Sequence, residues 1–181
     1  MLLNDLYNFL FIKLLYELII VLFFCKTIKS FDVYLNKNNN EIFEEINNHL
    51  IQHENYEEIN FYFDEIISYL KPKNSIFLNI NTNVTFWGNN ENKTLLDLAD
   101  FITFYIDIGF DKNNKSLIFK NFIFTKSQND SIFLIKDRNS AYQLIFENCI
   151  FENNNAILGI QSNCQNEKDK KQTIFNNCQF M

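Results

Sequence analysis

The histidines are the first candidates for chemistry. His49 and His53, the chain's two imidazoles, stand four residues apart, with Glu45 and Glu57 at the same spacing on either side. On a helix these four side chains share a face, and imidazoles with carboxylates are donors that can chelate a divalent metal. A solvated helix face explains the same spacing without a ligand. We take that as the leading interpretation, and we expect neither a metal nor a cofactor.

Carboxylates form the second candidate group. An acidic series within the strand-rich region consists of Asp97, Asp100, Asp107 and Asp111, which could form a calcium site or a carboxylate pair. Solvated turn residues are the leading alternative. Trp87, directly before Gly88, could stack on a sugar ring, but a lone tryptophan at the end of a strand is more often packed.

Composition limits the partners. The chain has 181 residues, enough for one domain, and its net charge is −6. An acidic chain with a single arginine argues against a nucleic-acid partner, which needs a basic surface to neutralise phosphates. Hydrophobic residues make up 47% of the chain and cluster in short runs, so a packed core is expected.

An eight-residue motif occurs three times and organises the chain. It reads LIFKNFIF at 117–124, LIFENCIF at 144–151 and TIFNNCQF at 173–180, so successive copies lie 27 and 29 residues apart. Such a period is typical of a stacked solenoid, in which one repeat cannot bury its apolar face alone. In a coil of parallel strands, each turn places a residue over its counterpart in the turn below.

Equivalent positions of the three copies define columns of like residues. The predicted ladder residues are Asn121, Asn148 and Asn177; Phe119, Phe146 and Phe175; and Phe124, Phe151 and Phe180. We assign the phenylalanines to the interior. The asparagines are assigned to the bend, where they tolerate a left-handed backbone and can bond the backbone of adjacent coils. By alternation, Ile118, Ile145 and Ile174 face outward as an apolar ridge, covered by a loop or by a partner.

Two of the four cysteines share a column. Cys149 and Cys178 are equivalent, whereas Cys25 and Cys164 lie elsewhere, and there is no C-x-x-C pair. Parallel neighbours about 4.8 Å apart are within reach of a disulfide. Two readings stay open: buried apolar thiols, or a bridge that joins Cys149 to Cys178 or involves Cys164.

The remaining elements follow from periodicity. Apolar residues at helical spacing predict an amphipathic helix over 40–52, and 58–64 is expected to be extended. From Ser75 onward, short apolar runs alternate with Asn-rich turns. The strands expected there are 76–80, 84–87, 101–108, 117–124, 131–135, 144–151, 156–160 and 173–180.

The N-terminus suggests export. Residues 14–25 form an apolar run of the length of a signal-peptide core, and residues 6–25 together approach a membrane span. A cleaved signal peptide, an uncleaved anchor and a core helix are the alternatives. Four N-x-S/T sequons, at Asn83, Asn92, Asn114 and Asn129, would accept glycans in a secreted chain.

The columns resemble those of the pectin-lyase-like parallel β-helix proteins, in particular the Asn- and Phe-rich surface proteins of single-celled eukaryotes. The resemblance covers about residues 75–181. It implies an all-β, right-handed parallel β-helix whose open end is plugged by an N-terminal helix, here 40–52. The expected organisation is therefore a signal or anchor over 1–30, a cap over 31–74 and coils over 75–181.

Activity does not follow from this resemblance. Lyases and hydrolases of that fold use clustered aspartates with a basic partner. Arg138, beside Asp137, is the one arginine, and the catalytic motifs have no matching positions here. The leading hypothesis is a non-catalytic, exported or membrane-tethered surface protein with a structural or adhesive β-helix. The alternative is a carbohydrate-active enzyme or polysaccharide-binding module. Because Met181 directly follows the third copy, we also expect either a longer solenoid or association through this coil end.

Overall fold

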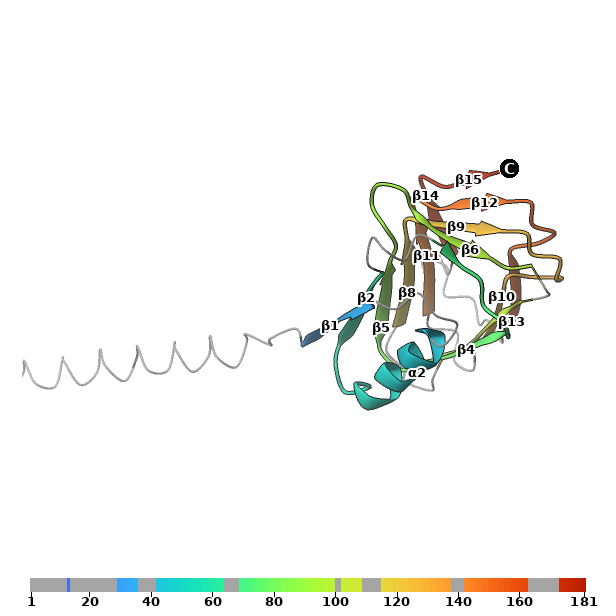
Figure 1. The fold of residues 1–181 in the computed structure, drawn as a ribbon. Coiled ribbons are helices and arrows are strands. Elements are labelled where there is room, and N and C mark those ends of the chain that lie inside the picture. The colour runs from blue at the N-terminus through green and yellow to red at the C-terminus, as the bar shows by residue number, and fades with distance from the viewer. Residues whose placement is uncertain are drawn as a thin grey trace, which may run out of the picture.

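The fold is a parallel β-solenoid of about four turns with one short helix in its described part. The computed structural model describes residues 13, 29–35, 42–63, 69–99, 102–108, 115–137, 142–162 and 173–181. All strand pairs among these residues are parallel, and they form three sheets, here called A, B and C. Figure 1 shows the strands of each sheet layered along one axis.

Each of the four complete turns contributes one strand to each sheet, and β1, β14 and β15 lie outside these turns. Sheet A is ordered β1 (Ser30–Leu35), β2 (Glu58–Phe63), β5 (Asn83–Trp87), β8 (Lys115–Lys120), β11 (Tyr142–Glu147) and β14 (Thr173–Asn176). Sheet B is ordered β3 (Tyr69–Leu70), β6 (Thr94–Asp97), β9 (Phe122–Thr125), β12 (Ile150–Glu152) and β15 (Gln179–Phe180). Sheet C is ordered β4 (Ile76–Ile80), β7 (Phe104–Ile108), β10 (Phe133–Asp137) and β13 (Leu158–Ser162).

The predicted phenylalanine columns are confirmed as stacks of rings. In sheet A the ring centroids of Phe119 and Phe146 lie 5.6 Å apart, and those of Phe146 and Phe175 lie 5.1 Å apart. The column also extends backwards, from Phe119 to Phe86 at 5.0 Å and from Phe86 to Phe61 at 5.2 Å. Like rings in register therefore form a continuous file across five strands of sheet A.

A second file runs along sheet B and packs against the first. Phe124 stacks on Phe151 at 5.1 Å, and Phe151 stacks on Phe180 at 5.4 Å. Between the files the rings meet edge to face, as Phe119 and Phe124 do at 81°. This offset of stacked and edge-on contacts is the geometry that aromatic quadrupoles favour.

The isoleucine column lies outside the core, as predicted. Ile118, Ile145 and Ile174 are partners in the register of sheet A and are all half-buried. On the same outer face, the Lys120 ammonium forms an ion pair with Oε2 of Glu147 at 2.8 Å. A charged pair therefore lies beside the isoleucine ridge.

The predicted helix is confirmed as α2 (Ile42–Gln52). Its apolar residues Ile42, Phe43, Ile46 and Leu50 are buried in the core. Residues 40 and 41 lie outside the described part. Figure 1 shows α2 at the end of the solenoid away from the C-terminus. The helix thus covers the apolar interior that the first coil would otherwise expose.

Three strands were not predicted: β1, β3 and β6. β1 pairs in parallel with β2, so the stacked strands begin upstream of residue 75. β6 arises from Thr94–Asp97, where Asp97 suggested a turn. The predicted signal or anchor segment lies outside the described residues apart from Lys13, Lys29 and Ser30. Among the described residues, no helix is long and apolar enough to span a membrane.

Candidate functional site

The asparagine column forms the corner between sheets A and B. Asn121, Asn148 and Asn177 have φ angles of 63°, 54° and 51°, so all three adopt the left-handed backbone expected for a sharp bend. Asn148 donates from Nδ2 to Oδ1 of Asn121 at 2.7 Å, and Asn177 donates to Asn148 at 3.3 Å. The ladder therefore joins side chain to side chain, and the predicted bonds to neighbouring backbone are corrected accordingly.

An inserted loop ends the ladder. Lys93 and Asn121 occupy equivalent corner positions, but residues 88–92 are inserted ahead of Lys93. Asn90 from this insertion accepts a hydrogen bond from Asn121 Nδ2 at 2.6 Å. The Lys93 ammonium donates to the carbonyl of Asn148 at 2.7 Å. The corner's polar groups are thus paired with one another across three coils.

Trp87 lies in an aromatic column on the outer face of sheet A. Tyr62 stacks on one face of its ring at 5.8 Å, and the Lys120 ammonium lies 4.2 Å from its centroid. The indole also donates to Oδ1 of Asn60 at 3.4 Å. Because a ring and a cation already flank Trp87, it does not offer the open face that sugar stacking needs, and the packed alternative is confirmed.

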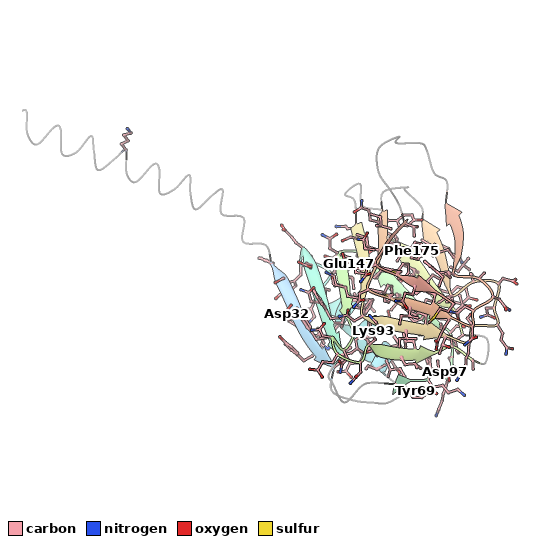
Figure 2. The ribbon with its side chains drawn as sticks, turned by 90° about the horizontal axis from the view of Figure 1, so that it is seen from above. Asp32, Tyr69, Lys93, Asp97, Glu147 and Phe175 are labelled. Carbon is pink, nitrogen blue, oxygen red and sulfur yellow. The ribbon has the colours of Figure 1, made fainter. Side chains whose placement is uncertain are left out.

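Asp97 is a buried carboxylate and not a solvated turn residue, so that interpretation was wrong for this position. It is 3% exposed, and its Oδ2 accepts from Lys126 at 2.7 Å and from the Tyr69 hydroxyl at 3.0 Å. Burial acts to raise the pKa of Asp97, but the bonds from Lys126 and from the Ala99 amide outweigh it, and the pKa falls below its usual value. Figure 2 shows Tyr69 and Asp97 side by side.

Of the other carboxylates of that series, the structure describes only Asp107. Asp107 is half-buried on β7, whereas Asp100 and Asp111 lie outside the described residues. Asp97 accepts hydrogen bonds from the Lys126 ammonium and the Tyr69 hydroxyl. Together with Lys126 it forms a structural ion pair between neighbouring coils.

The histidines are packed, so the expectation of a solvated face was wrong. His53 stacks on Phe31 of β1 at 3.7 Å and lies 5.7 Å from His49, nearly parallel. Desolvation and the neighbouring His53 lower the pKa of His49, although Glu45 acts in the opposite direction. Within the described ranges, no three His, Cys, Asp or Glu side chains are placed to hold a metal ion. The pair therefore fastens β1 to the cap helix.

Cys149 and Cys178 are free thiols on neighbouring coils. Cys149 is buried and donates to the Phe119 carbonyl at 3.4 Å, and Cys178 repeats this bond to Phe146 at the same distance. Burial raises the pKa of Cys149 to about 12 and also raises the pKa of Cys178. The two thiols occupy equivalent positions of neighbouring coils, with Cys149 buried and Cys178 half-buried. Cys25 and Cys164 lie outside the described residues.

The sequons differ in accessibility. Asn92 is exposed, whereas Asn83 is half-buried and accepts bonds from Ser116 at 3.0 and 3.2 Å. Asn129 donates from Nδ2, the atom a glycan would occupy, to Thr103 at 2.5 Å. Asn114 lies outside the described residues. Of the three described sequons, Asn92 is the one whose side chain reaches solvent most freely.

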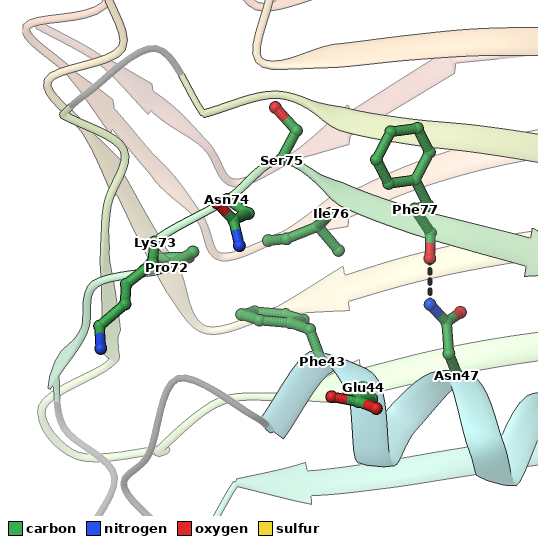
Figure 3. Close-up of a pocket in the computed structure, with 9 residues that line it drawn as sticks. All are labelled: Phe43, Glu44, Asn47, Pro72, Lys73, Asn74, Ser75, Ile76 and Phe77. Carbon is green, nitrogen blue, oxygen red and sulfur yellow. Dashed lines mark hydrogen bonds between the residues drawn. The ribbon is translucent and has the colours of Figure 1, made fainter.

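A groove that the sequence did not reveal opens between α2 and β4 (Figure 3). Its volume is about 400 Å³, and α2 contributes Phe43, Glu44 and Asn47. The facing wall is the segment 72–77, and the Asn47 amide donates to the Phe77 carbonyl. Sequence reasoning missed the groove because it depends on how the cap helix lies against the first strand of sheet C.

No protein-family model, curated protein or solved structure matches this chain in the comparisons made with each. The site is therefore interpreted from its own geometry.

Proposed function

We propose that this chain is a non-catalytic surface protein, exported or tethered to a membrane, whose solenoid serves as a structural or adhesive module. The observation that supports the proposal is the asparagine ladder, in which the reactive-looking polar groups of the corner bond one another. Asp97 is likewise paired with Lys126 between coils. Side chains held in this way rigidify a stack of coils and are not free to take part in a reaction.

We propose that the chain has the architecture of the pectin-lyase-like solenoids. Parallel strands of one sheet joined by a crossover connect right-handedly in about 98% of cases, which favours a right-handed coil. The resemblance in the repeat columns supports the same assignment, with Phe119 and Phe146 buried in its interior file; Phe175, predicted to be interior, stacks on Phe146 but is exposed.

Export is proposed from the apolar run at residues 14–25 and the four sequons. Expression in a eukaryotic secretory host and intact-mass analysis of the medium and membrane fractions test it. A glycosylated product, in the medium after cleavage near Ser30 or in the membrane uncleaved, is expected. A full-length unglycosylated product confined to the cytosol would contradict export.

The non-catalytic assignment is tested by prolonged incubation with acidic and neutral polysaccharides. Unchanged chain lengths are expected, with no new reducing ends or unsaturated products. Cleavage of any of the polymers would instead favour the carbohydrate-active alternative.

We further propose that the last coil is a surface for self-association. β14 and β15 are edge strands, and Phe180 is 56% exposed although its file is buried in the coils below. Light scattering after size exclusion should show mass rising with concentration, and less so for Phe180→Lys. A monomer at every concentration contradicts this proposal.

A further inference from the structure

Phe77 is an exposed ring that is stacked on one side only and that lines a groove. It lies on β4, the edge strand of sheet C, and stacks on Tyr105 of β7 at 4.8 Å and 9°. No second aromatic contact to Phe77 occurs among the described residues, and the side chain is 61% exposed. Trp87, by contrast, has Tyr62 on one side and the Lys120 ammonium close to its ring. The open face of Phe77 is available to an apolar ligand surface.

Polar side chains of both kinds line the groove to which Phe77 belongs. Lys73 and Asn74 supply donors, and Glu44 on the opposite wall supplies acceptors; all three are exposed. The Asn47 amide nitrogen is held by the Phe77 carbonyl, which fixes the orientation of its Oδ1 acceptor. In Figure 3 these side chains come from the helix and from the facing segment, around the buried Phe43 and Ile76.

This combination selects a class of ligand. A sugar ring presents an apolar C–H face for stacking and a rim of hydroxyls that both donate and accept. The groove, of about 400 Å³, falls within the usual range of ligand sites. Glu44 and the chain's net charge of −6 oppose an anionic ligand, and Lys73 is the single cation in the lining.

We propose that the groove between α2 and β4 binds a neutral saccharide, with one sugar ring stacked on Phe77 and its hydroxyls bonded to Glu44, Asn47 and Asn74. The inference names the ligand class of the adhesive module, so it rests on the proposed function. Carbohydrate affinity then belongs to the capped end of the solenoid and not to its outer sheet faces.

Saturation-transfer NMR on the full chain tests this inference. The probes are maltohexaose, cellohexaose and chitohexaose, with hexagalacturonate as the anionic comparison. Transfer to at least one neutral hexasaccharide is expected. Phe77→Ala should weaken its binding about tenfold, the order of one lost ring-stacking contact. Glu44→Gln should strengthen hexagalacturonate binding, because it removes the repelling carboxylate.

Tyr34→Ala is the matched control. Tyr34 is 72% exposed on the edge strand β1 and stacks on one ring only, that of Tyr62, yet it does not line the groove. Its loss should leave binding unchanged, and the amide spectrum checks that each variant is folded. No transfer to any neutral hexasaccharide, or equal binding by Phe77→Ala, overturns the inference. Chain-length analysis of the same samples tests the non-catalytic assignment separately, since cleavage and binding are distinct readouts.

Discussion

Gly88 lies beneath the corner residue Asn121, where no larger side chain fits. A Cβ atom built on Gly88 would come within 2.3 Å of the Asn121 carbonyl oxygen, and the Gly88 amide donates to the Lys120 carbonyl at 2.8 Å. The atom in the way belongs to the backbone, so the clash is relieved only by moving a strand. The close approach explains why a glycine follows Trp87.

Gly88→Ala should therefore lower the free energy of unfolding by about 1–3 kcal/mol, the usual cost of overpacking. Gly159→Ala is the control, because the nearest atoms there are side-chain atoms of Leu134 and Ser131 at 3.1 Å, which can shift. Urea denaturation measures both variants. Equal midpoints for Gly88→Ala and the parent chain would show that the corner is looser than described.

Acidification should weaken the fastening of β1 to the cap. The pKa of His49 is lowered in the folded chain, so the unfolded chain binds more protons in the range between the two values. The contribution of His49 to the free energy of unfolding is thus fully present above about pH 6.5, and it is lost as the pH drops below that value. Urea midpoints measured from pH 7.5 to pH 5 should decline.

His49→Gln should flatten this decline. The carboxylate of Asp97, whose pKa is lowered, loses its contribution only below its unfolded value of 3.8, so it does not act in the same range. An equally steep decline in His49→Gln would assign the pH dependence to other groups.

At the scale of elements, the asparagine corner combines two requirements that substitutions can separate. Asn148 has a φ angle of 54° and bonds Asn121 and Asn177 through its side chain. Asn148→Gly keeps the backbone relaxed and removes the bonds, and Asn148→Ala removes the bonds and adds left-handed strain.

The glycine variant should lose about 1–2 kcal/mol for the two bonds, and the alanine variant about 1–2 kcal/mol more for the strain. Thermal or urea unfolding gives both values. If the two variants are equally stable, the left-handed corner imposes no cost, and the account of the bend is wrong.

Elements with a repeated pattern could be predicted, and those that break the pattern could not. The three copies of the motif predicted both the register and the interior direction of Phe119 and Phe146. Strand β6 was not predicted because its one carboxylate, Asp97, argues against a buried strand. The residue that pairs with it, Lys126, lies on the next coil. A partner 29 residues away leaves no local pattern.

At the scale of the molecule, the solenoid has more coils than its visible repeats. Phe61, Phe86 and Phe119 are register partners, but their spacings of 25 and 33 residues differ from the 27 and 29 of the later copies. Residues 88–92, inserted at the corner, account for most of the longer spacing. Insertions at corners leave stacking intact while removing the constant period from which a repeat is recognised.

The location of the groove could not be predicted for a related reason. Helical periodicity showed that residues 40–52 form an amphipathic helix, and its apolar face was expected to cover the core. The remaining space beside Phe43 and Phe77 depends on the angle between α2 and β4, which no sequence pattern specifies.

Burial along the axis predicts unequal effects of like substitutions. Phe119 is buried between two stacked rings, whereas Phe180 is largely exposed on the last strand of sheet B. Phe119→Ala should cost about 3–5 kcal/mol and Phe180→Ala less than about 1 kcal/mol, measured by urea unfolding. Phe119→Leu gives a milder value if the alanine variant does not fold. Comparable losses at both positions would contradict a core that is open at its last coil.

The stacking of successive coils is tested most directly by ring-to-ring nuclear Overhauser effects in phenylalanine-labelled protein. The account predicts contacts that connect Phe61, Phe86, Phe119, Phe146 and Phe175 in that order, with centroids 5.0–5.6 Å apart. The ring of Phe119 should meet those of both Phe86 and Phe146, and no contact within this file should skip a strand of sheet A. Absence of the Phe119 to Phe146 contact, or contacts that join the rings in another order, would contradict the solenoid.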